Sequence, residues 1–95
     1  MDPRLAIMEA IVRRKVVQAY YNGSLTRLAP YMLFERNGEL FTAGLNVDKL
    51  WRLEEHPRLG QLKLVGLSGV SLTSEVFEQS PAITLSTPRP TTLWF

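Results

Sequence analysis

Residues 15–45 read KVVQAYYNGSLTRLAPYMLFERNGELFTAGL, with one Asn-Gly dipeptide at 22–23 and another at 37–38. Asn-Gly between apolar runs is the strongest short-range signal for a tight β-hairpin turn with positive φ at both central residues. The stretch therefore predicts a meander of three consecutive strands. Their predicted ranges are 15–21, 26–36 and 39–45.

A helix is predicted before this meander. Asp2-Pro3 is a favourable helix start, because Asp accepts hydrogen bonds from the first free amides and Pro is tolerated at the first helical position. Apolar residues then recur at helical spacing and predict an amphipathic helix over residues 3–14: Leu5, Met8, Ile11 and Val12. The cations Arg13-Arg14-Lys15 close the helix, and either complement the negative end of its dipole or contact a phosphate.

Two further strands, 61–67 and 70–73, are predicted after the meander, separated by Ser68-Gly69. Between the meander and these strands, residues 48–55 favour one or two helical turns that end before Pro57. One helix and five short strands joined by tight turns predict an α+β, mainly β domain: an N-terminal helix and a small, strongly bent five-stranded barrel. We expect this domain to span residues 1–80, with the barrel over 15–80.

The tail, residues 81–95, differs in character from the rest of the chain. It is rich in Pro, Ser and Thr, and Pro residues are excluded from the interior of a regular sheet. Nevertheless it ends in Leu93-Trp94-Phe95, an apolar stretch that does not favour full solvation. Two interpretations follow: a disordered end, or a segment that docks on its own barrel or on a neighbouring molecule.

Composition limits the class of protein. The chain of 95 residues has no cysteine, so a disulfide framework and thiolate metal sites are excluded, and a cytoplasmic location is expected. Its apolar runs are shorter than the ~20 residues that span a bilayer, and we expect no membrane association. A net charge of +2 permits contact with an anionic ligand without indicating a nucleic-acid-binding surface.

The motifs of common enzymes and cofactor sites are missing. His56 is the only histidine, and a lone His before Pro is most often an exposed loop residue. The six glycines form neither a dinucleotide-binding fingerprint nor a P-loop. We therefore expect a protein that is not an enzyme and that uses no cofactor or metal.

Aromatic and basic residues on the predicted strands are the remaining chemical signal. Tyr20 and Tyr21 are adjacent, so their side chains point to opposite faces of the sheet. If the strand 26–36 stays regular past Pro30, one face is its core side: Leu28, Pro30, Met32 and Phe34. Arg27 and Tyr31 then share the other face, where they either hold a nucleobase and its phosphate or belong to an ordinary surface strand.

The chain resembles the WYL domain, a small Sm-like (SH3-like) barrel found mostly in bacterial transcription regulators. The similarity runs in order over residues 5–80. It is carried by Met8-Glu-Ala-Ile11, Ala19-Tyr-Tyr-Asn-Gly23, Arg27-Leu-Ala-Pro-Tyr31, Asn37-Gly-Glu-Leu-Phe-Thr-Ala-Gly44, Leu62-Lys-Leu-Val-Gly-Leu67 and Leu72-Thr-Ser-Glu-Val-Phe77. The resemblance implies a ligand-sensing domain that binds single-stranded oligonucleotides or other nucleotides, here as a free-standing domain.

Carried over position by position, the resemblance implies a ligand site made of Tyr21, Arg27, Tyr31, Phe41 and Lys63. The family's Trp-Tyr-Leu tripeptide falls at Leu40-Phe-Thr42, so Phe41 keeps the ring of the tyrosine and loses its hydroxyl. Gly60 and Gly66 stand where the family typically has arginines, and Lys63 preserves one positive charge that cannot reproduce a bidentate guanidinium contact.

Two functions are therefore predicted from the sequence. The first is a regulatory domain that senses a nucleotide-like or single-stranded oligonucleotide effector through these five residues. The alternative is a protein-interaction or oligomerisation module that keeps the barrel, has lost the sensor site, and binds a protein partner or a second copy through Leu93, Trp94 and Phe95.

Overall fold

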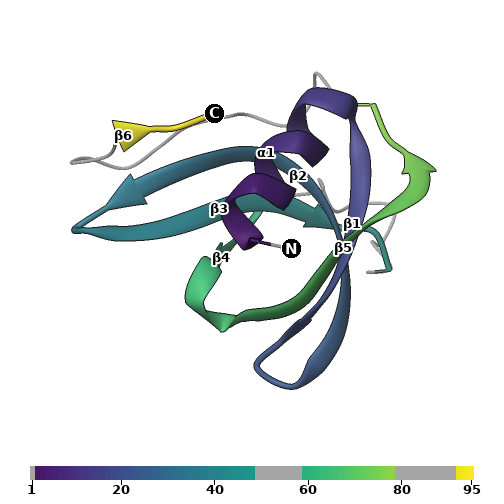
Figure 1. Ribbon diagram of the computed structural model, residues 1–95, viewed down its shortest axis with the longest axis horizontal. Helices are drawn as coiled ribbons and strands as arrows, with labels where there is room; N and C mark the ends of the chain where they lie inside the picture. Colours follow the sequence, from purple (N-terminus) through teal and green to yellow (C-terminus); the bar gives the residue numbers. More distant parts are fainter. Residues whose placement is uncertain (1, 49–58, 79–91) are drawn as a thin grey trace, which may run out of the picture.

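The computed structural model describes residues 2–48, 59–78 and 92–95. One helix is followed by strands that form a single antiparallel sheet (Figure 1). The elements are α1 (Pro3–Arg13), β1 (Lys15–Tyr21), β2 (Ser24–Arg36), β3 (Glu39–Asn46), β4 (Gly60–Lys63), the 3-10 turn η1 (Leu64–Gly66), β5 (Leu67–Val76) and β6 (Thr92–Leu93). Trp51, His56 and Pro57, with the helical turns expected near them, lie outside the described residues.

Helix α1 is confirmed, with the expected cap. An Oδ1 atom of Asp2 accepts a hydrogen bond from the Arg4 amide at 2.8 Å, and Pro3 occupies the first turn. The helix ends at Arg13 and is capped by Arg14, whose backbone is left-handed (φ 55°). The buried stripe differs from the predicted one, because small residues allow α1 to lie close to the sheet: Ala6, Ile7 and Ala10 are buried, whereas Leu5 and Val12 are exposed.

The predicted meander is also confirmed. Both Asn-Gly turns have positive φ at both residues, namely 50° and 86° at Asn22-Gly23 and 53° and 78° at Asn37-Gly38. The sheet has the strand order β4-β3-β2-β1-β5, all pairs being antiparallel. The expected barrel is not closed. Within the described residues the edge strands β4 and β5 do not pair with each other, and the chain passes from one to the other through η1.

The prediction for residues 61–73 was wrong in its turn position. Ser68-Gly69 lies inside β5, and the break between β4 and β5 is η1, which ends at Gly66. Gly69 has φ 59°, and β5 shifts register against β1 between the pairs Gln18–Ser71 and Tyr20–Ser68. The Ser-Gly signal therefore marks an irregularity within a strand, as glycine inside a strand pattern often does.

The predicted faces of β2 were also wrong, because the strand is not regular past Pro30. Pro30 lies opposite Gly44, whereas Met32 lies opposite Ala43, so Tyr31 is an extra residue at a β-bulge. A bulge reverses the alternation of the side chains that follow it. Leu28 and Leu33 consequently share the core cluster beneath α1, and Met32 and Phe34 pack in a second cluster with residues of β3.

The last strand, β6, answers the question left open for the tail. β1 pairs with β2 only as far as Leu28, so the same edge of β2 is available further along the strand. There β6 pairs with β2 in the register Phe34–Leu93 and Glu35–Thr92 (Figure 1). Residues 92–95 thus dock on the sheet of their own chain.

Candidate functional site

The structure distributes the five residues implied by the resemblance over three places. Arg27 and Tyr31 lie near the end of β5, Phe41 and Lys63 are direct neighbours on β3 and β4, and Tyr21 lies at the far end of β1. Two pairs are therefore brought together, whereas no single site made of all five is evident among the described residues.

Arg27 is held by two carboxylates. Its Nη1 lies 2.8 Å from Oδ1 of Asp48, and its Nη2 donates to Oε2 of Glu75. The three side chains are partly exposed, and together they form a neutralising cluster around the guanidinium. An incoming phosphate would compete with two carboxylates for this cation.

Tyr31 is a buried residue and not a surface aromatic. Its ring stacks on Phe77 with centroids 5.7 Å apart and an angle of 16° between the planes. Around it lies a small apolar cluster that includes Ala29, Leu45 and Val47. The face that the sequence predicted to be less apolar therefore carries a third apolar cluster, and a nucleobase could stack on the Tyr31 ring only if these contacts rearranged.

Phe41 is likewise used inside the fold. Its ring stacks on Phe34 at 5.5 Å between centroids, and the Arg36 guanidinium lies 4.6 Å from its centroid. Phe41 thus has an aromatic ring and a cation as neighbours within the fold. Lys63, its cross-strand neighbour, pairs with Oε2 of Glu39 at 3.1 Å.

Tyr21 packs against Gly66, one of the two glycines at positions where the resemblance implies arginines. A Cβ atom on Gly66 would lie 2.8 Å from Cε1 of Tyr21 and 3.2 Å from Oδ1 of Asn22. The amide of Asn22 also donates to the Gly66 carbonyl at 3.2 Å. Gly66 therefore allows the first hairpin to pack closely on η1. Among the described residues, the nearest atom to a Cβ added at Gly60 would be the Gly44 carbonyl oxygen, at 4.0 Å.

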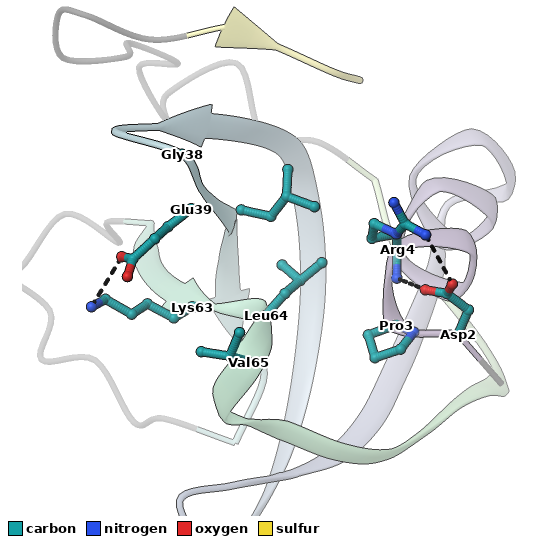
Figure 2. A pocket seen from close by; sticks show the side chains of 9 residues that line it. Asp2, Pro3, Arg4, Gly38, Glu39, Lys63, Leu64 and Val65 are labelled. Carbon is teal, nitrogen blue, oxygen red and sulfur yellow. Dashed lines mark hydrogen bonds and ion pairs between the residues drawn. The ribbon is translucent and has the colours of Figure 1, made fainter.

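A pocket of about 390 Å³ lies between the start of α1, the turn that opens β3, and the segment from β4 to η1 (Figure 2). Its apolar lining includes Pro3, Leu40, Leu64 and Val65, and two ion pairs flank it: Asp2 with Arg4, and Glu39 with Lys63. The side-chain hydrogen bond from Arg4 lowers the pKa of the Asp2 carboxyl, with the Arg4 amide adding to the effect. Each flanking cation thus already has a carboxylate partner, and only Lys63 of the five expected residues reaches this pocket.

The surface around β6 is the other notable feature. Leu93, Trp94 and Phe95, which we call the β6 surface, have exposed fractions of 62%, 40% and 45%. Their backbone is tied to Leu33: the Leu33 amide donates to the Phe95 carbonyl at 3.0 Å, and the Leu33 carbonyl accepts from the amides of Trp94 at 2.8 Å and Phe95 at 3.0 Å. Trp94 Nε1 also donates to Oε1 of Glu35 at 3.2 Å.

Sequence reasoning identified the apolar end of the chain and missed its receptor. Leu33 and Glu35 were not predicted as part of any site. The edge of β2 can pair with β6 here because its pairing with β1 ends at Leu28, and the sequence does not show where that pairing ends. The one signal in the sequence is the length of the predicted strand 26–36, which exceeds that of its neighbour 15–21.

Comparisons with other proteins complete the description of the site. The chain matches no protein-family model and no curated protein. Among the residues that the structure describes, no helix is long and apolar enough to cross a membrane.

Proposed function

We propose that this domain is a protein-interaction module that assembles with further copies of itself through the β6 surface. The observation that carries the proposal is the exposure of Leu93, on β6, and of Trp94 and Phe95, the two residues that follow this strand. Apolar side chains exposed to water carry a free-energy cost, and exposed apolar surface commonly marks sites of association.

The contacts of the expected sensor residues support the same proposal. Arg27 is neutralised by Asp48 and Glu75, Tyr31 is buried against Phe77, and Phe41 is stacked on Phe34. A ligand that used these groups would have to break contacts that the fold already uses. The sensing of a nucleotide-like effector, and the Sm-like (SH3-like) and WYL character on which that hypothesis rests, stay predictions with less support from the geometry.

The proposal is tested by the molar mass of the full chain in solution. Multi-angle light scattering over a range of concentrations is expected to show a mass that rises from that of a 10.8 kDa monomer toward that of a dimer. Trp94→Ser and Leu93→Ser are each expected to weaken this self-association at least tenfold, because they remove apolar area from the contact.

Leu25→Ser is the matched control for Leu93→Ser. Leu25 is also a strand residue and has a similar exposed fraction, 56%, but it lies beside the first hairpin, away from β6. The control is expected to associate like the wild type. A wild-type mass that stays monomeric at all concentrations, or equal effects of Leu25→Ser and Leu93→Ser, would contradict the proposal.

A further inference from the structure

We infer that the pocket between α1, β3 and η1 is a binding site for a small, uncharged ligand with an apolar body, such as an aromatic ring on a short chain. The inference goes beyond the proposed function, because none of the described residues that line the pocket belongs to the β6 surface. Three features carry it: the apolar floor, the exposed Val65 at the rim, and the pairing of the four charged side chains that line the pocket (Figure 2).

The floor of the pocket continues the core of the domain. Leu64 is buried in the core cluster beneath α1, and Leu40 packs against the same cluster. The two flanks are set by local structure, because Asp2 caps the first turn of α1 and the Asn37-Gly38 turn leads into β3. The pocket is therefore formed by the fold itself, and a ligand that enters it loses little of its binding free energy to ordering the protein.

Val65 supplies exposed apolar surface at the rim of this floor. It is 90% exposed, the largest exposed fraction among the large apolar residues that the structure describes. Val65 belongs to the short turn η1, and turn positions that face water usually carry polar residues, glycine or proline. A ligand seated on Leu40 and Leu64 would cover Val65 and remove its side chain from water.

The size of the pocket suits a small molecule. Pockets that bind small molecules typically enclose about 300–1,000 Å³, and their lining is mostly apolar with a few polar groups that orient the ligand. This pocket encloses about 390 Å³, near the lower end of that range. We therefore expect a ligand with one or two rings or a short branched chain.

The charges around the pocket disfavour a charged ligand. Arg4 Nη2 lies 3.3 Å from Oδ2 of Asp2, and Lys63 Nζ lies 3.1 Å from Oε2 of Glu39. An anion that approached either cation would meet the carboxylate already bound there, and a cation that approached either carboxylate would meet its bound cation. An uncharged ligand leaves both ion pairs intact while its apolar body contacts the floor.

The test compares three compounds that share a phenylpropyl body and differ in charge. They are phenylpropionamide, which is neutral, phenylpropionate, an anion, and phenylpropylamine, a cation at neutral pH. Binding to the isotope-labelled full chain is followed by the NMR chemical shifts of the Leu40, Leu64 and Val65 amides. The neutral amide is expected to give saturable shifts and to bind at least about fivefold more tightly than either charged compound, because a charge gains no free partner in this pocket.

Val65→Asp locates the site. It is expected to weaken the binding of phenylpropionamide at least about fivefold, because a carboxylate replaces apolar area that the ligand covers. Val76→Asp is the matched control, since Val76 is also an exposed valine (64%), lies at the end of β5 and does not line the pocket. Both positions face water, so both variants are expected to fold, and the control is expected to bind like the wild type.

Three results would overturn the inference. The first is that phenylpropionamide shifts none of the three pocket amides at any concentration. The second is an equal loss of binding in Val65→Asp and Val76→Asp. The third is that the charged compounds bind as tightly as the neutral one.

Light scattering separates this inference from the proposed function. The mass of the wild type is expected to be the same with and without phenylpropionamide, because the ligand does not contact the β6 surface. If the compound dissociated the assembly, the pocket would belong to the contact between copies, and a separate ligand site would be contradicted while self-assembly stood. A wild type that is monomeric at every concentration and still binds phenylpropionamide would contradict the proposed function and support the ligand site.

Discussion

Gly44 shows how one residue allows the irregular part of this sheet to form. It lies opposite Pro30, beside the bulge at Tyr31. A Cβ atom at this position would lie 2.8 Å from the Ala29 carbonyl oxygen and 2.9 Å from two carbon atoms of Leu28. The backbone of β2 therefore approaches β3 more closely here than any side chain would permit.

We expect Gly44→Ala to lower the free energy of unfolding by about 1–3 kcal/mol, because the added methyl group overpacks a buried site where a backbone atom must move. Gly60→Ala is the matched control on the neighbouring strand, since the nearest atom of the described residues would lie 4.0 Å from the added Cβ. The control is expected to change stability by less than about 0.5 kcal/mol. Urea denaturation measures both, and a loss for Gly44→Ala no larger than that for Gly60→Ala would contradict this account of the bulge.

Among the elements, the β1–β2 hairpin has its geometry set by its turn. Asn22 and Gly23 both have positive φ, which matches a two-residue turn whose twist suits the flanking strands. The register that follows, from Tyr21–Ser24 to Val17–Leu28, brings Val17 and Leu28 into the core beneath α1. The turn thus decides which residues of both strands are buried.

Gly23→Ala is expected to destabilise the protein by about 1 kcal/mol, through the cost of the left-handed backbone to a residue with a Cβ atom. In the part of the chain that the structure describes, no atom lies within 4 Å of the position of that Cβ, so steric overlap is not the expected cause. Gly23→Asn should cost less than Gly23→Ala, since Asn tolerates the left-handed region better. Thermal unfolding checks this order, and an alanine variant as stable as the wild type would show that the turn tolerates another conformation.

At the scale of the whole molecule, both faces of the sheet are covered where β2 crosses it. Leu28 to Phe34 are all buried, with one cluster under α1 and others on the opposite side. Aromatic residues of this sheet pack inside the fold: Tyr31 stacks on Phe77, and Phe41 stacks on Phe34. Tyr31 and Phe41, two aromatic residues of the expected ligand site, can therefore stack on a base only by breaking these contacts.

We therefore expect a labelled single-stranded oligonucleotide to bind weakly, with little difference between single strand and duplex in fluorescence anisotropy. Binding in the micromolar range or tighter that falls steeply with salt would instead show a phosphate-contacting site and favour the sensor hypothesis. Arg27→Ala then tests the residues, because it should weaken such binding if Arg27 contacts the phosphate. Arg13→Ala, at an exposed cation paired with Glu9, is the matched control.

The sequence alone determined the helix, the two hairpins and therefore the central three strands. These features depend on local physics: a capping Asp before Pro, and Asn-Gly turns that need positive φ at two adjacent residues. It also identified Leu93-Trp94-Phe95 as an unusual apolar segment. The resemblance implied a single ligand site, made of Tyr21, Arg27, Tyr31, Phe41 and Lys63. No local pattern in the sequence indicates how far apart the fold places these residues.

Only the tertiary structure decided the faces of β2, the partners of Arg27 and the position of β6. Each depends on residues far apart in the sequence. The bulge in β2 needs Gly44 on β3, and the Arg27 guanidinium pairs with Asp48 and Glu75. β6 pairs with the part of the β2 edge that β1 leaves uncovered. Strand alternation is a rule of period two, and one inserted residue reverses it for every position that follows. The physical reason is that the pairing between strands determines where a bulge forms and which strand edge stays unpaired. The residues of a single strand do not determine either.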